Sequence, residues 1–167
     1  MCGIGYTNDY IRYGANWDEL DVAYKQYTAN EKIKTHLLST AQFYNIYDLI
    51  NVIKYWYENG NRETNLIFNV VNYPEDQQFD ILPYEDRLDV ADQLEQAMKD
   101  YIPKHLWDVS RLEHIITRLR EQFDDEVIAS QRKRMAKRTE MYDKIRNQDI
   151  ELVHPHIAKL CKEWLTI

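Results

Sequence analysis

The sequence predicts an α/β protein: a partial (βα) barrel of about three parallel strands, followed by a mostly α-helical C-terminal half. Two runs rich in apolar and β-branched residues, 33–40 and 64–73, flank an amphipathic stretch. A strand, a helix and a strand in this order favour a parallel crossover connection. From residue 84 onward, almost every segment has the spacing of apolar residues that is typical of helices.

The first strand is expected over residues 2–5, before a glycine-containing turn. A helix then starts at Asn16 or Asp18, because either side chain can cap it, and it ends near Ala29. The second strand covers residues 33–40, between a charged loop and a polar segment. We therefore expect the chain to begin partway through a repeating strand-helix unit.

An amphipathic helix is predicted over residues 46–58, and Gly60 just after it is a C-cap signal. The third strand covers residues 65–72 and stops before Pro74. A short extended piece is expected at 79–83. These elements complete a predicted barrel segment over the first half of the chain.

The second half is predicted to be helical throughout. The expected helices are 85–100, 107–123, 126–147 and 156–165. A single uninterrupted helix over 107–147 is the competing interpretation, because no Gly or Pro lies inside that range. We expect two segments that pack as one unit: a barrel segment over 1–83 and a helical segment over 84–167.

Charge and cysteine content exclude several classes of protein. The formal net charge of −7 disfavours nucleic-acid binding, because phosphate backbones attract an excess of Lys and Arg. No run of apolar residues is long enough to span a membrane and the N-terminus lacks a signal-peptide pattern, so we expect a soluble cytoplasmic protein. Cys2 and Cys161 are the only cysteines, which provides neither a disulfide framework nor a zinc or cluster motif. We expect each to be an ordinary free thiol.

Four sequence motifs occur in a characteristic order. They are Gly-x-Gly at 3–5 followed by DYIRYGANW at 9–17, a strand ending in STAQ at 39–42 with Asn45, the segments NVVNYPE at 69–75 and ILP at 81–83, and the tail at 141–160. Together they resemble the C-terminal half of radical S-adenosylmethionine proteins, especially viral and bacterial members with a twitch-type C-terminal region. The similarity covers nearly the whole chain.

This resemblance implies a partial (βα) barrel with its cofactor, S-adenosylmethionine, at the carboxyl ends of the strands. In such proteins an early C-x3-C-x2-C loop holds a four-iron four-sulfur cluster, and this chain has no such motif. The resemblance therefore implies the C-terminal portion of a split or truncated radical oxidoreductase, whose iron-sulfur cluster is supplied by a partner chain. The alternative is a non-enzymatic protein-binding or ligand-binding remnant that acts through its helical tail.

Four residues are candidates for cofactor or substrate contacts. Arg12 can present paired donors to a carboxylate, and by resemblance it faces the methionine carboxylate of the cofactor. Gln42, Asn45 and Asn72 follow the ends of neighbouring predicted strands, where ligand hydroxyl and amino groups are commonly bound. No catalytic residue and no metal ligand is assigned.

Each candidate also has a purely structural explanation. Arg12 can form an ion pair with a nearby acid, namely Asp9, Asp18 or Glu19. Asn45 can cap the following helix, and Asn72 can satisfy the turn before Pro74.

Two further motifs favour structural roles. His154-Pro155-His156 has no third nearby ligand, so a helix start at Pro155 explains it better than a metal site. The basic run at 131–138 is expected to be the solvent-exposed side of an amphipathic helix, with a buried side formed by Ile128, Met135 and Tyr142.

The small predicted sheet implies a partner. Its first strand has unpaired backbone groups on its outer side unless something covers it. We expect the N-terminal half protein to pair there, or the chain to self-associate through this strand. A content of 13 Tyr and 4 Trp also suits half-exposed interface surfaces.

Overall fold

The computed structural model describes residues 1–30, 32–61, 64–102 and 109–166. Within these residues the fold combines many helices with one two-stranded sheet of β1 (His36–Ala41) and β2 (Asn65–Val70). The strands are parallel in one continuous register, in which His36 pairs with Asn65 and Ala41 pairs with Val70. The predicted parallel strand-helix-strand unit is therefore confirmed, with α3 (Leu49–Asn59) as its helix.

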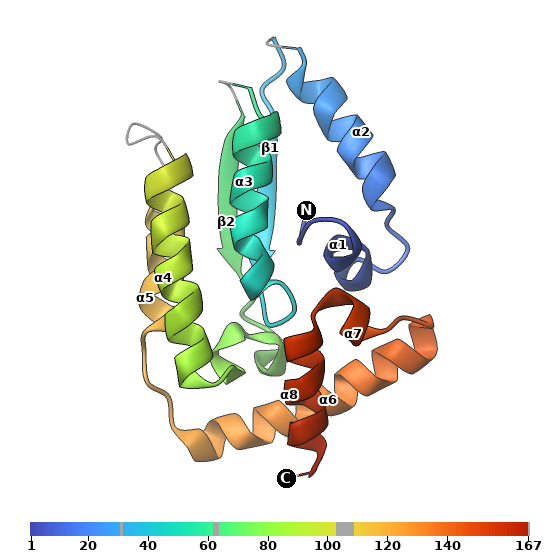
Figure 1. Cartoon of the computed structure of the whole chain (residues 1–167), viewed down its shortest axis with the longest axis vertical. Helices are drawn as coiled ribbons and strands as arrows, with labels where there is room; N and C mark the ends of the chain where they lie inside the picture. Colours follow the sequence, from blue (N-terminus) through green and yellow to red (C-terminus); the bar gives the residue numbers. More distant parts are fainter. Residues whose placement is uncertain (31, 62–63, 103–108, 167) are drawn as a thin grey trace.

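The sheet has one buried face and one exposed face. Figure 1 shows α3 lying over the two strands. On β1, Leu37, Ser39 and Ala41 are buried, whereas the Leu38 side chain between them is 44% exposed. Because side chains alternate between faces along a strand, Leu38 and its partner Ile67 belong to the opposite face. Parallel sheets are normally covered on both faces, so this exposure is unusual.

The predicted first strand at 2–5 is wrong, and with it the three-stranded sheet: the described residues contain two strands. Residues 2–5 form a turn whose N–H groups bond to side chains instead of to β1. Cys2 N donates to Asn8 Oδ1 (3.1 Å), and Ile4 N donates to Asp48 Oδ2 (2.6 Å). Gly5 has φ 57°, a left-handed conformation that glycine adopts without strain, and a helix starts directly after it.

Two helices precede β1, and one of them was predicted. The short α1 (Tyr6–Ile11) follows the turn, and α2 (Trp17–Thr28) agrees with the predicted helix. The side chain of Asn16 accepts from Asp18 N (3.0 Å) and so caps α2 as expected.

The helix between the strands also agrees with its prediction, except at its first turn. A 3-10 helix over Ile46–Asp48 leads into α3, which ends where Gly60 N donates to Trp56 O (2.8 Å). The C-cap prediction is therefore confirmed.

The connection after β2 is not extended as predicted. It contains two 3-10 turns, Glu75–Gln77 and Phe79–Ile81. Two buried carboxylates hold it against the second half of the chain: Asp76 pairs with Arg138 (3.0 Å), and Asp80 pairs with Arg118. Burying a carboxylate is costly unless it is paired with a cation. The segment therefore bends toward the helices that carry the two arginines.

The second half consists of α4 (Tyr84–Tyr101), α5 (Ser110–Leu119), α6 (Asp125–Arg146), α7 (Ile150–Val153) and α8 (Pro155–Thr166). The alternative of one continuous helix over 107–147 is wrong, because residues 120–124 are not helical and Asp124 caps α6 by accepting from Glu126 N (2.9 Å). The first two residues of the predicted helix 107–123 lie outside the described residues. Pro155 begins α8 as predicted.

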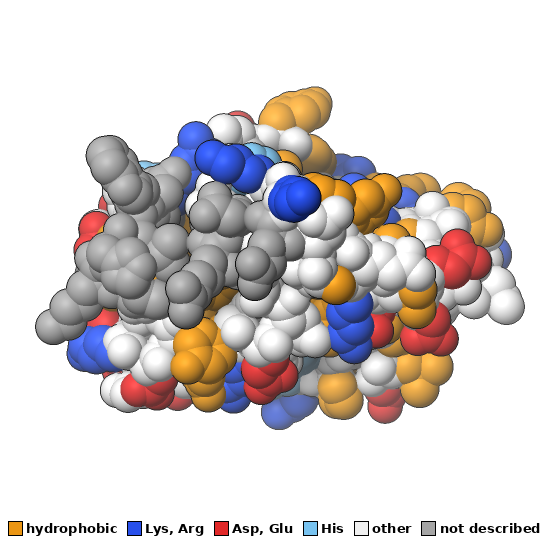
Figure 2. Space-filling view, turned by 90° about the horizontal axis from the view of Figure 1, so that it is seen from above, with side chains coloured by type: hydrophobic (Ala, Val, Ile, Leu, Met, Phe, Trp, Pro, Cys, Tyr) orange, Lys and Arg blue, Asp and Glu red, His pale blue; other side chains and the backbone are white. Residues whose placement is uncertain are grey.

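One hydrophobic core joins the two predicted segments. It includes fully buried residues of both, such as Phe43, Ile53, Leu94 and Ile115. In the part of the chain that is described, no helix combines the length and the apolar composition that a membrane crossing requires. Figure 2 shows basic, acidic and hydrophobic side chains interspersed on the upper face of the molecule.

Candidate functional site

The carboxyl ends of β1 and β2 lie side by side because the strands are parallel. Val71 N donates to Ala41 O (3.0 Å) where the strands end, and Phe43 N donates to Gln77 O (2.8 Å) just beyond. The segments that carry Gln42, Asn45 and Asn72 therefore meet at the carboxyl end of the sheet, as the parallel topology predicts.

Asn45 is the best-connected residue at this end of the sheet. It is fully buried, and its Oδ1 accepts from Gln42 N (2.9 Å). Its Nδ2 donates to Thr40 O (2.9 Å) and to Cys2 O (2.6 Å). Its side chain makes no capping hydrogen bond, so the predicted helix-cap role is wrong. Asn45 instead ties the N-terminus to the end of β1.

Gln42 differs from Asn45 because its side-chain amide remains available. The residue is only 8% exposed. Its side chain forms no hydrogen bond with a described residue, whereas its backbone N–H is bound by Asn45. Most buried polar side chains have a partner, so this amide is well suited to bind a ligand group.

Arg12 lies on the other side of Cys2. Its Nε donates to Cys2 Sγ (3.2 Å), while the residue as a whole is exposed. Burial, and secondly the charge of Arg12, lower the pKa of the Met1 ammonium. Among the described residues no carboxylate lies within ion-pair distance of Arg12, so the predicted pairing with a neighbouring acid is not found.

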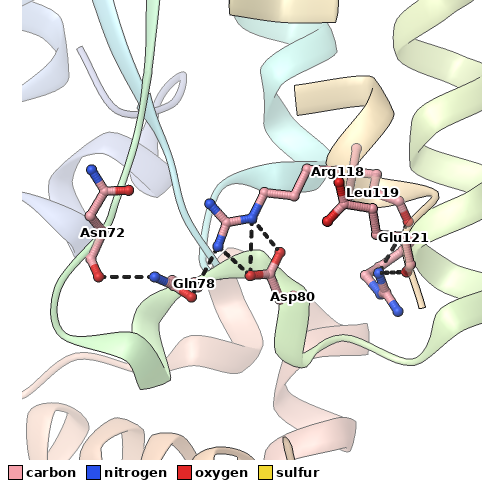
Figure 3. A network of polar contacts seen from close by, with 7 residues as sticks. Asn72, Gln78, Asp80, Arg118, Leu119 and Glu121 are labelled. Carbon is pink, nitrogen blue, oxygen red and sulfur yellow. Dashed lines mark hydrogen bonds and ion pairs between the residues drawn. The ribbon is translucent and has the colours of Figure 1, made fainter. Parts of the chain in front are cut away.

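Asn72 belongs to a neighbouring polar network. Its main-chain O accepts from Gln78 Nε2 (2.9 Å), and Gln78 Oε1 accepts from Arg118 Nη2 (3.1 Å). Figure 3 shows this chain of contacts, which continues through Arg118 to Asp80. The main-chain carbonyl of Asn72 therefore stabilises the turn before Pro74. Asn72 itself is an exposed residue.

The structure thus gathers three of the four candidates. Arg12 and Asn45 each donate to Cys2, Gln42 donates its backbone N–H to Asn45, and Asn72 lies on the adjacent loop. This arrangement offers a guanidinium and an amide for polar recognition. Within the described ranges no three His, Cys, Asp or Glu side chains are grouped closely enough to hold a metal ion.

The two histidines of the tail have structural partners. His156 Nε2 lies 2.7 Å from Asp86 Oδ2, and the His154 ring stacks on Tyr47 with centroids 4.5 Å apart. Burial, with a smaller contribution from His156, lowers the pKa of His154. Their role in the start of α8 agrees with the prediction.

Sequence reasoning missed the inward-facing arginines of the basic run. Met135 is buried as predicted, yet Arg132 donates to Ile81 O (2.7 Å) and Arg138 pairs with Asp76. These two arginines are partly buried instead of lying on a purely solvent-exposed side. No local pattern reveals these contacts, because Asp76 lies 62 positions from Arg138 and Ile81 lies 51 positions from Arg132.

Comparisons with known proteins do not assign a family. No protein-family model, curated protein or solved structure matches the chain. Its function therefore has to be inferred from its residues and their geometry.

Proposed function

We propose that this chain is the C-terminal part of a two-part radical S-adenosylmethionine oxidoreductase. In this proposal it contributes contacts to S-adenosylmethionine or substrate, and a partner chain supplies the iron-sulfur cluster. The supporting observation is the parallel β1–α3–β2 unit, in which one face is exposed and polar residues gather at the strand ends. The chemistry in this proposal comes from the order of the four sequence motifs, which resembles that of radical S-adenosylmethionine proteins.

The outer edge of β1 is suited to pairing with another strand. Leu38 O accepts from the Met1 ammonium (2.9 Å), and Thr40 O accepts from Asn45. The N–H groups of Leu38 and Thr40 make no hydrogen bond to a described residue. The two N–H groups that remain beside the exposed Leu38 can donate to an added strand.

The strand-end residues then have distinct proposed roles. Arg12 binds the methionine carboxylate of the cofactor, and Gln42 uses its available amide to bind a polar group of cofactor or substrate. Asn72 contributes from the exposed loop. Asn45 acts as a positioning residue, because its side-chain hydrogen bonds are all internal. Two buried free thiols suit a reducing compartment, so we place this assembly in the cytoplasm.

Co-expression with the protein of the adjacent upstream reading frame tests the proposal. We expect both chains to co-purify with iron-sulfur absorbance that neither shows alone. Leu38→Lys should abolish the association, because it places a charge on the exposed sheet face. The matched control is Val22→Lys, at a site on α2 that is 53% exposed, and it should leave the association intact. Independent elution of two folded chains would refute the proposal.

A non-enzymatic binding protein is the second candidate. Its helical tail carries exposed apolar side chains, Met141 and Ile145 on α6 and Leu152 on α7, and Ile145 is 72% exposed. Residues four apart on a helix share a face, so Met141 and Ile145 form one apolar strip. If this candidate is correct, Ile145→Lys disrupts partner binding while S-adenosylmethionine has no effect on melting.

A further inference from the structure

A groove unrelated to the strand ends lies where the start of α4, the connection between α5 and α6, and α6 itself meet. It has a volume of about 270 Å³ and is lined by Tyr84, Arg87, Gln122, Phe123, Ile128 and Arg132. Pockets for drug-sized ligands are mostly larger, so this groove suits a smaller molecule. Two of its six lining side chains are cationic and none is acidic.

Arg87 is the central feature of this groove. It is only 3% exposed, yet among the described residues it forms no ion pair with a carboxylate. Its Nη1 donates to the main-chain oxygens of Leu119 (3.2 Å) and Glu121 (2.6 Å), both labelled in Figure 3. These two bonds stabilise the carboxyl end of α5. They leave the guanidinium without a carboxylate of a described residue within ion-pair distance.

One edge of the Arg87 guanidinium remains unused. Its Nε is buried and has no hydrogen-bond partner among the described residues, and its Nη2, which is less buried, forms no hydrogen bond with them either. Buried charged groups are normally paired, and a guanidinium forms its strongest hydrogen bonds with an oxyanion. The charges of Asp80 and Glu121 act on Arg87 from beyond ion-pair distance, and Asp80 is already paired with Arg118. An unused guanidinium edge beside a groove therefore indicates an external acceptor.

The other residues that line the groove indicate what kind of molecule carries this acceptor. The Arg87 Cζ atom lies 4.8 Å from the ring centroid of Phe123 and 5.2 Å from that of Tyr84. Ile128 adds an aliphatic surface. These walls favour a ligand that has an apolar body as well as a charged group.

We propose that this groove binds a small carboxylate anion with an apolar body, whose carboxylate accepts from Nη2, on the unused Nε–Nη2 edge of the Arg87 guanidinium. The planar carboxylate matches the edge of a guanidinium better than a tetrahedral phosphate does. The site is independent of the proposed radical chemistry, since it shares none of the strand-end residues.

Benzoate is the probe, measured by titration calorimetry and thermal melting of the full chain, with chloride at equal ionic strength as the salt control. At a concentration several times its Kd, benzoate should raise the melting temperature by about 2–4 °C. Gln122→Glu should weaken benzoate binding at least about tenfold, because a carboxylate at the exposed position 122 competes for the guanidinium. Gln26→Glu on α2 adds the same charge far from the groove and should bind benzoate as the wild type does.

Arg87→Lys provides a second test, since lysine keeps the charge but has no Nε–H edge. We expect it to lose benzoate binding, and Gln122→Glu keeps the proposal testable if Arg87→Lys does not fold. Equal benzoate affinity in Gln122→Glu and wild type would overturn the proposal. So would the absence of benzoate binding to the wild type, or tighter binding of inorganic phosphate than of benzoate.

Discussion

Asn45→Ala tests whether the edge of the sheet is held together as the structure indicates. The Asn45 side chain is fully buried and forms three hydrogen bonds, one each with Gln42 N, Thr40 O and Cys2 O. Alanine removes all three and leaves their backbone partners without a bond. The N-terminus then loses one of its attachments to the end of β1.

The expected cost follows from the number of bonds. Each buried hydrogen bond contributes about 1 kcal/mol net, so the loss of three lowers the free energy of unfolding by about 3 kcal/mol. For a chain of this size, that corresponds to a melting temperature lower by about 6–12 °C. Such a loss is a large fraction of the total stability of a typical domain, which is about 5–15 kcal/mol.

Urea unfolding followed by circular dichroism measures this change. Asn51→Ala is the matched control, because Asn51 is exposed and its one side-chain hydrogen bond goes to Asp48 (2.7 Å). We expect the control to change the free energy of unfolding by no more than about 0.5 kcal/mol. Equal changes in the free energy of unfolding for the two substitutions would refute a stabilising role for the three hydrogen bonds of Asn45.

Two further predictions concern ionisable groups. A double-mutant cycle of Asp76→Ala and Arg138→Ala should give a coupling free energy of about 1–3 kcal/mol in urea unfolding, because Asp76 is only 3% exposed; additive effects would contradict a direct pair. The second concerns His154, whose pKa is lowered in the folded state from 6.5. Since the unfolded chain binds this proton more tightly, the stability that neutral His154 contributes is present above about pH 6.5 and is lost as the pH falls through the folded pKa. His154→Leu should reduce the loss of unfolding free energy at low pH. An unchanged dependence of stability on pH in this variant would disprove the contribution of His154.

Some of the fold was readable from local patterns. The strands β1 and β2, the helix α3 between them and the cap of α2 at Asn16 were all predicted. Each depends on periodicity or on capping within a few residues, so the information is present in a short stretch of sequence. The parallel pairing followed from the strand-helix-strand order, because parallel neighbours require a crossover.

Other elements depended on distant partners. Residues 2–5 have the composition of a short strand, yet Asp48 takes the N–H of Ile4 and Asn8 takes that of Cys2. Residues 79–83 were expected to be extended, and the pairing of Asp80 with Arg118 turns them instead. No local pattern reveals a partner that lies 38 or 44 positions away along the chain.

The candidate site was predictable in place but not in detail. Adjacent strand ends bring the segment of Gln42 and Asn45 beside the segment of Asn72 because the sheet is parallel, which the sequence alone indicates. Whether an amide is bound internally, as in Asn45, or left available, as in Gln42, depends on which backbone groups reach it in three dimensions.

Periodicity, capping residues and element order by themselves determined the βαβ unit and the positions of most helices, since these depend on interactions within a few turns of chain. Tertiary structure alone decided that the described part of the chain forms a sheet of two strands and that acids and arginines far apart in sequence pair inside the protein. It also decided that Arg87 is buried with no carboxylate of a described residue within ion-pair distance. The physical reason is that a buried polar group takes whichever partner the packed chain brings within hydrogen-bond distance, and sequence spacing does not specify that distance.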